Sequence, residues 1–322
     1  MRYVIGIDVG GTRVKAGAVD RAGKLLRHSI GPSHAERGPA ALLRALVDQV
    51  RELRKAMGER PAGIALGLSG AVDPSIGTVC LPGKFKGLEE FPLVPKLSAA
   101  VKAPVVADND ARLAMIAEKT WGAAMPYDWA VMVSIGTGLG SGVVLEGKIL
   151  RDPHLQFGTQ LGHIVIQALG GRLCLTNARG TAEMLCSATA LASAVRDGMQ
   201  RGIHSILTER YWRDPHSIDF AAVLDGVAKK DRLCVDELEH WRKNLGWLLV
   251  SAVHAYAPQI IILGGGGAKA AKYFLPALKK QVNEHVFRHP RGEAVPIVVS
   301  KLGDHAGVLG AAALAWERSP KQ

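Results

Sequence analysis

An aspartate stands inside an apolar segment at the start of the chain. Asp8 lies within Tyr3-Val-Ile-Gly-Ile-Asp-Val9, which has the composition of a buried strand, and Gly10-Gly11-Thr12 follows at once. An unpaired buried carboxylate costs more free energy than one strand returns, so Asp8 needs a cation or a hydrogen-bond donor. Glycines in the turn permit positive φ and leave backbone N–H groups open to a bulky anion. The segment therefore predicts either a site for a metal-bound phosphate or a β-hairpin with a Gly-Gly turn.

Length and composition set the broad class. The 322 residues favour two domains, and 48% hydrophobic with 21% charged residues is typical of a globular protein. No signal sequence follows Met1 and no apolar run approaches the length that crosses a bilayer, so we expect a cytoplasmic protein with no membrane partner. The four cysteines form no C-x-x-C pair and are expected to be reduced.

The formal charge of +11 favours anionic partners such as a nucleotide, a phosphorylated product or polyphosphate. Basic residues are spread along the chain, without interleaved aromatic residues or an arginine-rich arm. A nucleic-acid partner is therefore not expected.

Three polar residues follow a second apolar strand. The pattern before them predicts a meander of three strands over 3–29, a helix over Pro39–Met57, a strand over Ala62–Leu68 and a turn-rich loop over 69–77. Pro104–Ala107 then runs into Asp108-Asn109-Asp110, and a helix is expected over Ala111–Thr120. Ligands bind in α/β folds where a strand ends and a helix begins. The alternative is that Asp108 or Asp110 simply caps the helix, although three consecutive polar residues leave one to cap and another for chemistry.

The N-terminal pattern returns after Gly122. Residues 129–151 repeat an apolar strand, a glycine-threonine turn and two further strands, and Gly147-Lys-Ile-Leu-Arg151 matches Gly23-Lys-Leu-Leu-Arg27. Two phosphate-type hairpins indicate two similar domains that face each other across a cleft. Convergence of two unrelated hairpins is the alternative.

A third glycine-rich turn lies nearer the C-terminus. The apolar strand Gln259–Leu263 leads into Gly264-Gly-Gly-Gly267 and a helix expected to start near Lys269. Glycine lets the backbone lie against a ring or a phosphate, so this turn suits a nucleotide, with a tight strand-to-helix connection as the alternative. The chain closes with a strand over Val295–Ser300 and a helix of small residues over His305–Trp316.

Together these segments resemble the ROK family of sugar kinases and repressors, in the actin-like ATPase superfamily. The matching segments occur in family order over nearly the whole chain: Ile7-Asp-Val-Gly-Gly-Thr12, Asn109-Asp110, Ile135-Gly-Thr-Gly-Leu-Gly140, Gly162-His163, Ile262-Leu-Gly-Gly-Gly-Gly267 and Ala306-Gly-Val-Leu-Gly-Ala311. The resemblance implies an α/β fold with two actin-like (ribonuclease H-like) domains that flank a nucleotide and sugar cleft. The N-terminal domain is expected over 1–122 and the C-terminal domain over 123–304, with the helix 305–318 packing back on the first. It also implies a homodimer.

The resemblance further implies an ATP- and Mg²⁺-dependent kinase that phosphorylates a hydroxyl of a hexose or hexose derivative. Asp110 is the expected general base, and Asp8 is expected to hold Mg²⁺ through water. The expected sugar contacts are Asn109, Gln160, His163 and Glu183. The expected phosphate and adenosine contacts are Gly10, Gly11, Thr12, Gly136, Thr137, Gly138, Gly265 and Gly266.

The zinc motif of the family is incomplete in this chain. Cys174 stands at the first cysteine position, but Thr176 and Thr181 occupy the positions of two others. His163 and Cys174 cannot complete a tetrahedral site, so no structural zinc is expected and His163 serves as a sugar contact or a structural histidine. The loop is instead expected to be held by hydrogen bonds and by the apolar side chains of Leu161, Ile164, Ile166 and Leu173.

The identity of the sugar and of the phosphate donor stays open. Gln160 replaces a glutamate of the family, and the loop Leu81–Lys86 lacks the asparagine common in glucokinase-like members. A polyphosphate-dependent glucokinase and a non-catalytic sugar sensor are the alternatives. A DNA-binding repressor is disfavoured because the first phosphate loop starts at residue 4, which leaves no room for a preceding helix-turn-helix.

Overall fold

The computed structural model describes residues 2–73, 77–82, 85, 87–89, 91–151, 159–287 and 292–319. Contacts divide the chain into two compact units, which are described one at a time. Unit 1 consists of residues 1–128, 142–159 and 300–322, and unit 2 of residues 129–141 and 160–299.

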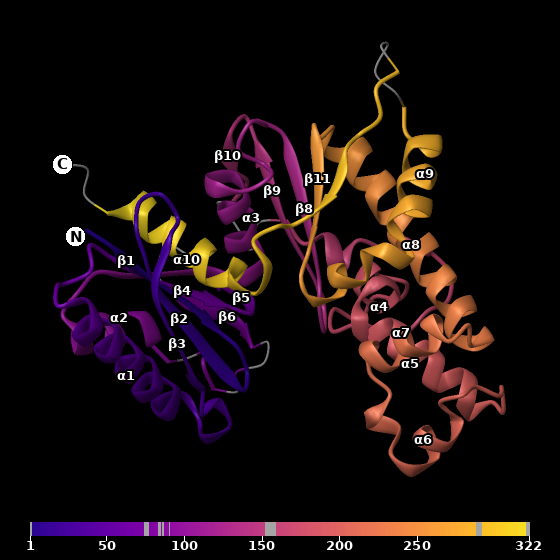
Figure 1. Cartoon of the computed structure of the whole chain (residues 1–322), viewed down its shortest axis with the longest axis horizontal. Coiled ribbons are helices and arrows are strands. Elements are labelled where there is room, and N and C mark those ends of the chain that lie inside the picture. The colour runs from indigo at the N-terminus through magenta and orange to yellow at the C-terminus, as the bar shows by residue number, and fades with distance from the viewer. Residues whose placement is uncertain are drawn as a thin grey trace. The chain divides into compact units, whose positions relative to one another are not determined.

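Unit 1 is built on a five-stranded mixed sheet (Figure 1). Its strands are β1 (Val4–Val9), β2 (Arg13–Val19), β3 (Leu25–Pro32), β4 (Ile64–Leu68) and β7 (Val105–Asn109). They lie in the order β3-β2-β1-β4-β7. The first three form an antiparallel meander, whereas β4 and β7 run parallel to β1. The carboxyl ends of β1, β4 and β7 therefore meet at one edge of the sheet.

Helices cover both faces of this sheet. The four main helices of unit 1 are α1 (Pro39–Met57), α2 (Leu93–Val101), α3 (Asp110–Trp121) and α10 (Ala306–Arg318). Strand side chains alternate between the faces: Ile5 and Leu66 join the core under α1 and α2, while Val4 and Ala65 join the core under α3 and α10. Figure 1 shows α1 and α10 on opposite sides of the strands. The C-terminal helix therefore belongs to the core of unit 1.

A two-stranded hairpin in unit 1 departs from the predicted loop over 69–77. It consists of β5 (Gly70–Asp73) and β6 (Thr78–Pro82), which pair antiparallel. Val72 and Val79 are partners in this pairing, and both side chains are buried, so their apolar character favours a strand. Much of the predicted loop Leu81–Lys86 lies outside the described residues.

The second five-stranded sheet has the strand order of the first. Its strands are β8 (Ala130–Ile135), β9 (Leu139–Leu145), β10 (Lys148–Ile149), β11 (Ile260–Gly264) and β12 (Ile297–Val299). They lie in the order β10-β9-β8-β11-β12, and both β11 and β12 run parallel with their neighbours. Each sheet thus begins with three consecutive strands and adds two later parallel strands beside the first. This shared order accounts for the repeated sequence pattern.

Unit 2 contains six α-helices among its described residues. They are α4 (Ala182–Cys186), α5 (Ala188–Gln200), α6 (Thr208–Arg213), α7 (Phe220–Ala228), α8 (Arg232–Tyr256) and α9 (Leu275–His285), and the long α8 packs against α4, α5, α7 and α9. The helix predicted near Lys269 is a 3-10 helix, η4 (Gly266–Tyr273). The α-helix begins only at Leu275, where Pro276 suits the first turn because it needs no N–H partner there. Among the described residues, no helix has the length and apolar character to cross a bilayer.

Candidate functional site

The predicted site residues fall into two groups, one in each unit. In unit 1, Asp8 and Asp108 lie in one row across the sheet, because each is the register partner of Gly67 on the strand between them. With strands about 4.8 Å apart, the two aspartate Cα atoms are separated by roughly 10 Å. Gly67 also lies beside the start of α3, because a Cβ at this position would come within 3.1 Å of Leu113 Cδ1 and 3.9 Å of the Cα of Asp110. The strand register thus gathers Asp8 and the Asp108–Asp110 segment at one edge.

Asn109 caps α3, the role that the alternative interpretation of the sequence gave to Asp108 or Asp110. Its Oδ1 accepts hydrogen bonds from the backbone N–H groups of Ala111 at 3.0 Å and Arg112 at 3.1 Å, and its Nδ2 donates to the Gly70 carbonyl at 2.9 Å. An amide fits this position because one end must accept and the other donate. Asp110 Oδ1 accepts from the N–H of Ala111 at 2.8 Å, and its side chain is only half-buried.

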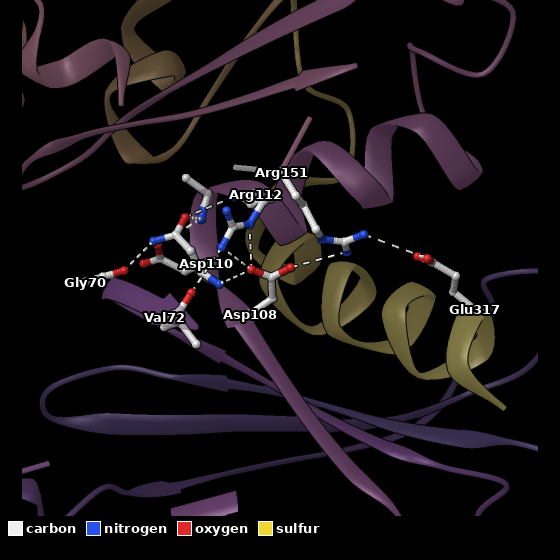
Figure 2. Close-up of polar contacts among 9 residues, drawn as sticks. Gly70, Val72, Asp108, Asp110, Arg112, Arg151 and Glu317 are labelled. Atoms are coloured by element: carbon white, nitrogen blue, oxygen red, sulfur yellow. Dashed lines mark hydrogen bonds and ion pairs between the residues drawn. The ribbon is translucent and has the colours of Figure 1, made fainter. Parts of the chain in front are cut away.

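Asp108 is fully buried and paired, which its sequence pattern did not predict (Figure 2). Its Oδ1 accepts from Arg112 Nε at 2.6 Å and lies 2.5 Å from Arg112 Nη2. Its Oδ2 is 3.3 Å from Nη2 of Arg151, whose Nη1 lies 3.9 Å from Glu317 on α10. The spacing of four residues between Asp108 and Arg112 on adjoining strand and helix is the one sequence signal for this cluster.

The first glycine turn is fastened from behind by Ser33. The Ser33 hydroxyl donates to the Gly11 carbonyl at 2.6 Å, and its N–H donates to the Thr12 carbonyl at 2.9 Å. Gly10 donates to the Arg13 carbonyl at 2.9 Å, which closes the turn. Ser33 is fully buried whereas Thr12 is exposed, so the turn is fixed on its inner side and open on its outer side. This geometry is suited to an anion that approaches from solvent.

In unit 2, the turn after β8 is held by α4 and α5. Gly136 donates to the Gly138 carbonyl at 3.0 Å and accepts from the N–H of Ala188 at 2.9 Å. Oε2 of Glu183 accepts from the N–H of Leu139 at 3.0 Å, and a Cβ on Gly138 would come within 2.4 Å of the same oxygen. Glu183, predicted as a sugar contact, thus also supports the predicted phosphate turn.

The glycine run after β11 packs against the same turn. Gly265 has φ of 77°, and a Cβ there would lie 2.4 Å from the carbonyl oxygen of Ile135. A Cβ on Gly267 would meet the Ile135 side chain at 2.4 Å, whereas one on Gly266 would meet nothing within 4 Å. Glycine is therefore needed at 265 and 267 for packing, while Gly266 is the open member of the run.

Gln160 precedes a short 3-10 helix, η2 (Leu161–His163), of which His163 is the last residue. Gln160 is exposed, and its carbonyl accepts from the His163 N–H at 3.0 Å. Ser141 Oγ accepts from the Leu161 N–H at 3.1 Å, which ties this helix to β9. His163 Nδ1 is buried without a hydrogen-bond partner among the described residues.

The two metals implied by the family fit this chain differently. The Asp8 carboxylate packs against α10, where a Cβ on Gly307 would lie 2.7 Å from Oδ2. One such carboxylate suits Mg²⁺, which keeps water ligands and takes phosphate oxygens. Zinc does not fit: Cys174 Sγ is 2.9 Å from the Thr176 hydroxyl, and no group of three or more His, Cys, Asp or Glu side chains gathers in the described parts of the chain.

This chain is similar to known proteins over nearly its whole length. The model of the ROK family matches residues 4–318. A glucokinase of Thermotoga maritima is 30% identical over 317 residues, which cover 98% of this chain and 98% of that protein. A xylose repressor of Caldicellulosiruptor bescii is 25% identical over 316 residues, 97% of this chain and 77% of that protein.

Solved structures agree in fold. A ROK family glucokinase from Streptomyces griseus, in complex with glucose and AMPPNP, superposes with a TM-score of 0.83 at 25% identity, covering 98% of this chain and 99% of that one. A ROK hexokinase from Thermus thermophilus superposes with a TM-score of 0.80 at 29% identity, covering 98% of both chains.

Proposed function

Because the chain belongs to the ROK family and has its actin-like fold, we propose that it is a sugar kinase. It transfers the γ-phosphate of ATP to a hydroxyl of a hexose or hexose derivative. The observation that carries this proposal is the placement of Asp8 and Asn109-Asp110 at one carboxyl edge of the first sheet, joined by their register with Gly67. Phosphoryl transfer needs a metal-binding carboxylate and a separate base, and Asp8 and Asp110 are the proposed residues for these two roles.

Asp110 is the proposed general base. It takes the proton of the sugar hydroxyl as the hydroxyl oxygen bonds to the γ-phosphorus, while the bond to the β-phosphate oxygen breaks and ADP leaves. Asn109 supports this assignment because it already caps α3 through two backbone N–H groups, so Asp110 is not needed as the cap. The Asn109 side chain is also proposed to orient the sugar.

Asp8 is proposed to hold Mg²⁺ through water, and the metal would supply positive charge to the phosphate oxygens. Gly10, Gly11, Thr12, Gly136, Thr137 and Gly138 are proposed to contact phosphates. Gly265 and Gly266 are proposed to lie against the adenosine, and Gly266 is the one of the two that leaves open space beside its Cα. Gln160, His163 and Glu183 complete the proposed sugar contacts.

The proposal is tested by measuring turnover with ATP, polyphosphate or no donor against a panel of hexoses, aminohexoses and N-acetylated hexoses. We expect ATP- and Mg²⁺-dependent release of ADP with at least one sugar. Turnover with polyphosphate but not ATP would replace the nucleotide assignment. Tight binding of a sugar with no phosphorylated product would favour the alternative of a non-catalytic sugar sensor. The similarity to a xylose repressor is the observation that favours this alternative.

The same purified protein serves to test the proposed homodimer, which remains a prediction. Sedimentation equilibrium would give about twice the 34.2 kDa chain mass for a dimer. A single-chain mass at micromolar concentration would contradict it.

A further inference from the structure

Asp108 occupies a position where a charge is expensive. Its side chain is fully buried, and it lies on the strand face shared by Val4 and Ala65, under α3 and α10. A buried carboxylate costs several kcal/mol unless it is paired and hydrogen-bonded. Its pairing with Arg112 and Arg151 offsets that cost, yet an apolar side chain would avoid it altogether.

The hydrogen bonds of this cluster converge on the backbone of Asn109 and the start of α3. Asp108 Oδ1 accepts from the Asn109 N–H at 2.7 Å as well as from Arg112. Arg112 also makes two contacts of its own. Its backbone N–H donates to Asn109 Oδ1, and its side-chain Nη2 donates to the Val72 carbonyl on β5 at 3.4 Å. Figure 2 shows the Arg112 side chain next to Asp108. Asp108 and Arg112 therefore both hold the end of β7, the cap residue Asn109 and the first turn of α3 in place.

The cluster is a poor device for stability alone. Arg112 is 3% exposed, and its Nη1 has no hydrogen-bond partner among the described residues; the same holds for Nε of Arg151. Buried ion pairs with unsatisfied donors are often no more stable than apolar side chains of similar volume. The contribution of Asp108, Arg112 and Arg151 to stability thus does not explain why these charged groups lie next to Asn109-Asp110.

We propose that Asp108 and Arg112 are positioning residues that hold Asn109 and Asp110 in the geometry needed for phosphoryl transfer. Arg151, which lies in the 142–159 segment of unit 1, pairs with Asp108 as well. It also pairs with Glu317 and so connects Asp108 to α10. The proposal rests on the proposed function, because Asp110 acts here as the general base. A displacement of the base by about 1 Å is enough to cost on the order of a hundredfold in rate.

The test compares Arg112→Met with the double variant Asp108→Val/Arg112→Met. The single variant leaves Asp108 short of its main partner and should lower the melting temperature. The double variant removes both charges and should recover most of that loss, while kcat stays about ten- to hundredfold below wild type and KM for ATP is nearly unchanged. A stability role alone would restore kcat together with the melting temperature, and a double variant within about threefold of wild-type kcat overturns the proposal.

A matched control comes from unit 2. Arg242 on α8 is 7% exposed and paired with Glu239 at 2.5 Å and 2.8 Å, and its contacts include no candidate site residue. Glu239 is 46% exposed, so this pair shares with the Asp108 cluster only a buried arginine. Glu239→Gln/Arg242→Met should therefore leave kcat unchanged, which separates loss of a buried arginine and its carboxylate partner in general from loss of Asp108 and Arg112.

Amide hydrogen exchange supplies a readout that does not depend on turnover. In the double variant, the N–H groups of Asn109, Ala111 and Arg112 should exchange about tenfold faster or more, while those of α1 keep their wild-type rates. Unchanged exchange at these three amides overturns the positioning role even if wild type proves inactive on every sugar. Absence of turnover in wild type, by contrast, counts against the proposed function itself.

Discussion

The carboxylate of Glu183 accepts a hydrogen bond from the backbone N–H of Leu139 at 3.0 Å. Helix α4 is thereby fastened to the turn between β8 and β9. The same oxygen fills the space beside Gly138 that a Cβ would need. Glu183, which is predicted to contact sugar, is therefore in direct contact with the turn at Gly138, which is predicted to contact phosphate. A substitution in either should change the position of the other.

Gly138→Ala should disturb both predicted contacts. The added Cβ would lie 2.4 Å from Glu183 Oε2 and must push the carboxylate away, which loosens its bond to Leu139. We expect weaker binding of ADP and of the sugar by calorimetry, each by about tenfold, and a lower melting temperature. Gly266→Ala meets nothing within 4 Å and should leave the melting temperature unchanged. Equal melting temperatures for the two variants would contradict the predicted clash.

Asp110→Asn should fold, bind sugar and lose turnover. Asparagine retains an Oδ1 that can accept from the Ala111 N–H, as Asp110 does at 2.8 Å, but it cannot take a proton from a hydroxyl. Loss of a general base costs about two to four powers of ten in kcat. Steady-state kinetics checks this, and a variant that keeps more than about a hundredth of the wild-type rate would assign Asp110 to binding instead.

Asn109→Ala provides the contrasting case. It removes the cap of α3 and the bond to Gly70, so it should cost about 1 kcal/mol or more in the free energy of unfolding by urea titration. Asp110→Asn should change that free energy far less. Comparison of the two variants thus distinguishes Asn109, which caps α3, from Asp110, the proposed general base.

Local patterns were sufficient to predict much of the first unit. The spacing of apolar residues over Pro39–Met57 and the following glycine predicted α1, and Gly58 indeed has φ of 74° with its N–H bonded to the Arg54 carbonyl. The ROK resemblance, and with it the α/β actin-like fold, is confirmed by the family match and the solved structures. These features depend on residues that are close in sequence or on motifs in a fixed order.

What was missed depends on contacts between distant segments. The bond between Asp108 and Arg151 joins residues 43 positions apart, and the row formed by Asp8, Gly67 and Asp108 exists only through strand register. The choice of Asn109 as cap depends on the Gly70 carbonyl that faces its amide. No local pattern encodes these partners. The assigned roles of the site residues themselves remain predictions.

Cys174 should ionise near neutral pH. The Thr176 hydroxyl, 2.9 Å from Sγ, and nearby backbone groups lower the pKa of the Cys174 thiol to about 7 against the opposing effect of burial. Burial instead raises the pKa of Cys186, and it raises that of Cys234 to about 12. A lowered pKa means that the thiolate predominates above pH 7 and declines as pH falls below it.

Alkylation by iodoacetamide, followed by mass analysis of the Cys174 peptide from pH 5.5 to 9.5, should show a midpoint about 7. Cys174 is only 6% exposed, so the midpoint is the diagnostic quantity and the absolute rate is not. Thr176→Val should move the midpoint up towards the ordinary thiol value, because it removes the hydroxyl donor at nearly constant volume. A wild-type midpoint near 9 would show that the hydroxyl does not stabilise the thiolate.

The last prediction is that the native protein needs no zinc. A structural zinc site requires four ligands drawn from thiolate, imidazole or carboxylate, and threonine hydroxyls at 176 and 181 are neutral and reluctant to deprotonate. The Thr181 side chain is fully buried, whereas the Thr176 hydroxyl lies against Cys174 Sγ. Backbone bonds hold the loop instead, including Cys174 N–H to the Ala178 carbonyl at 2.9 Å and Ala182 N–H to the Ile164 carbonyl at 2.9 Å.

Of the apolar side chains expected to pack this loop, Leu161 is buried but Leu173 is 50% exposed, so hydrogen bonds carry more of the role than predicted. Protein purified without added zinc should contain well under one equivalent, and a chelator should leave its melting temperature unchanged. Thr176→Cys/Thr181→Cys is the matched variant. Sγ atoms on one tetrahedral zinc lie about 3.8 Å apart, so the 2.9 Å between Cys174 Sγ and the side-chain oxygen at position 176 would have to widen on binding. That variant should gain zinc and a chelator-sensitive melting temperature, whereas stoichiometric zinc in the wild type would mean that ligands distant in sequence complete the site.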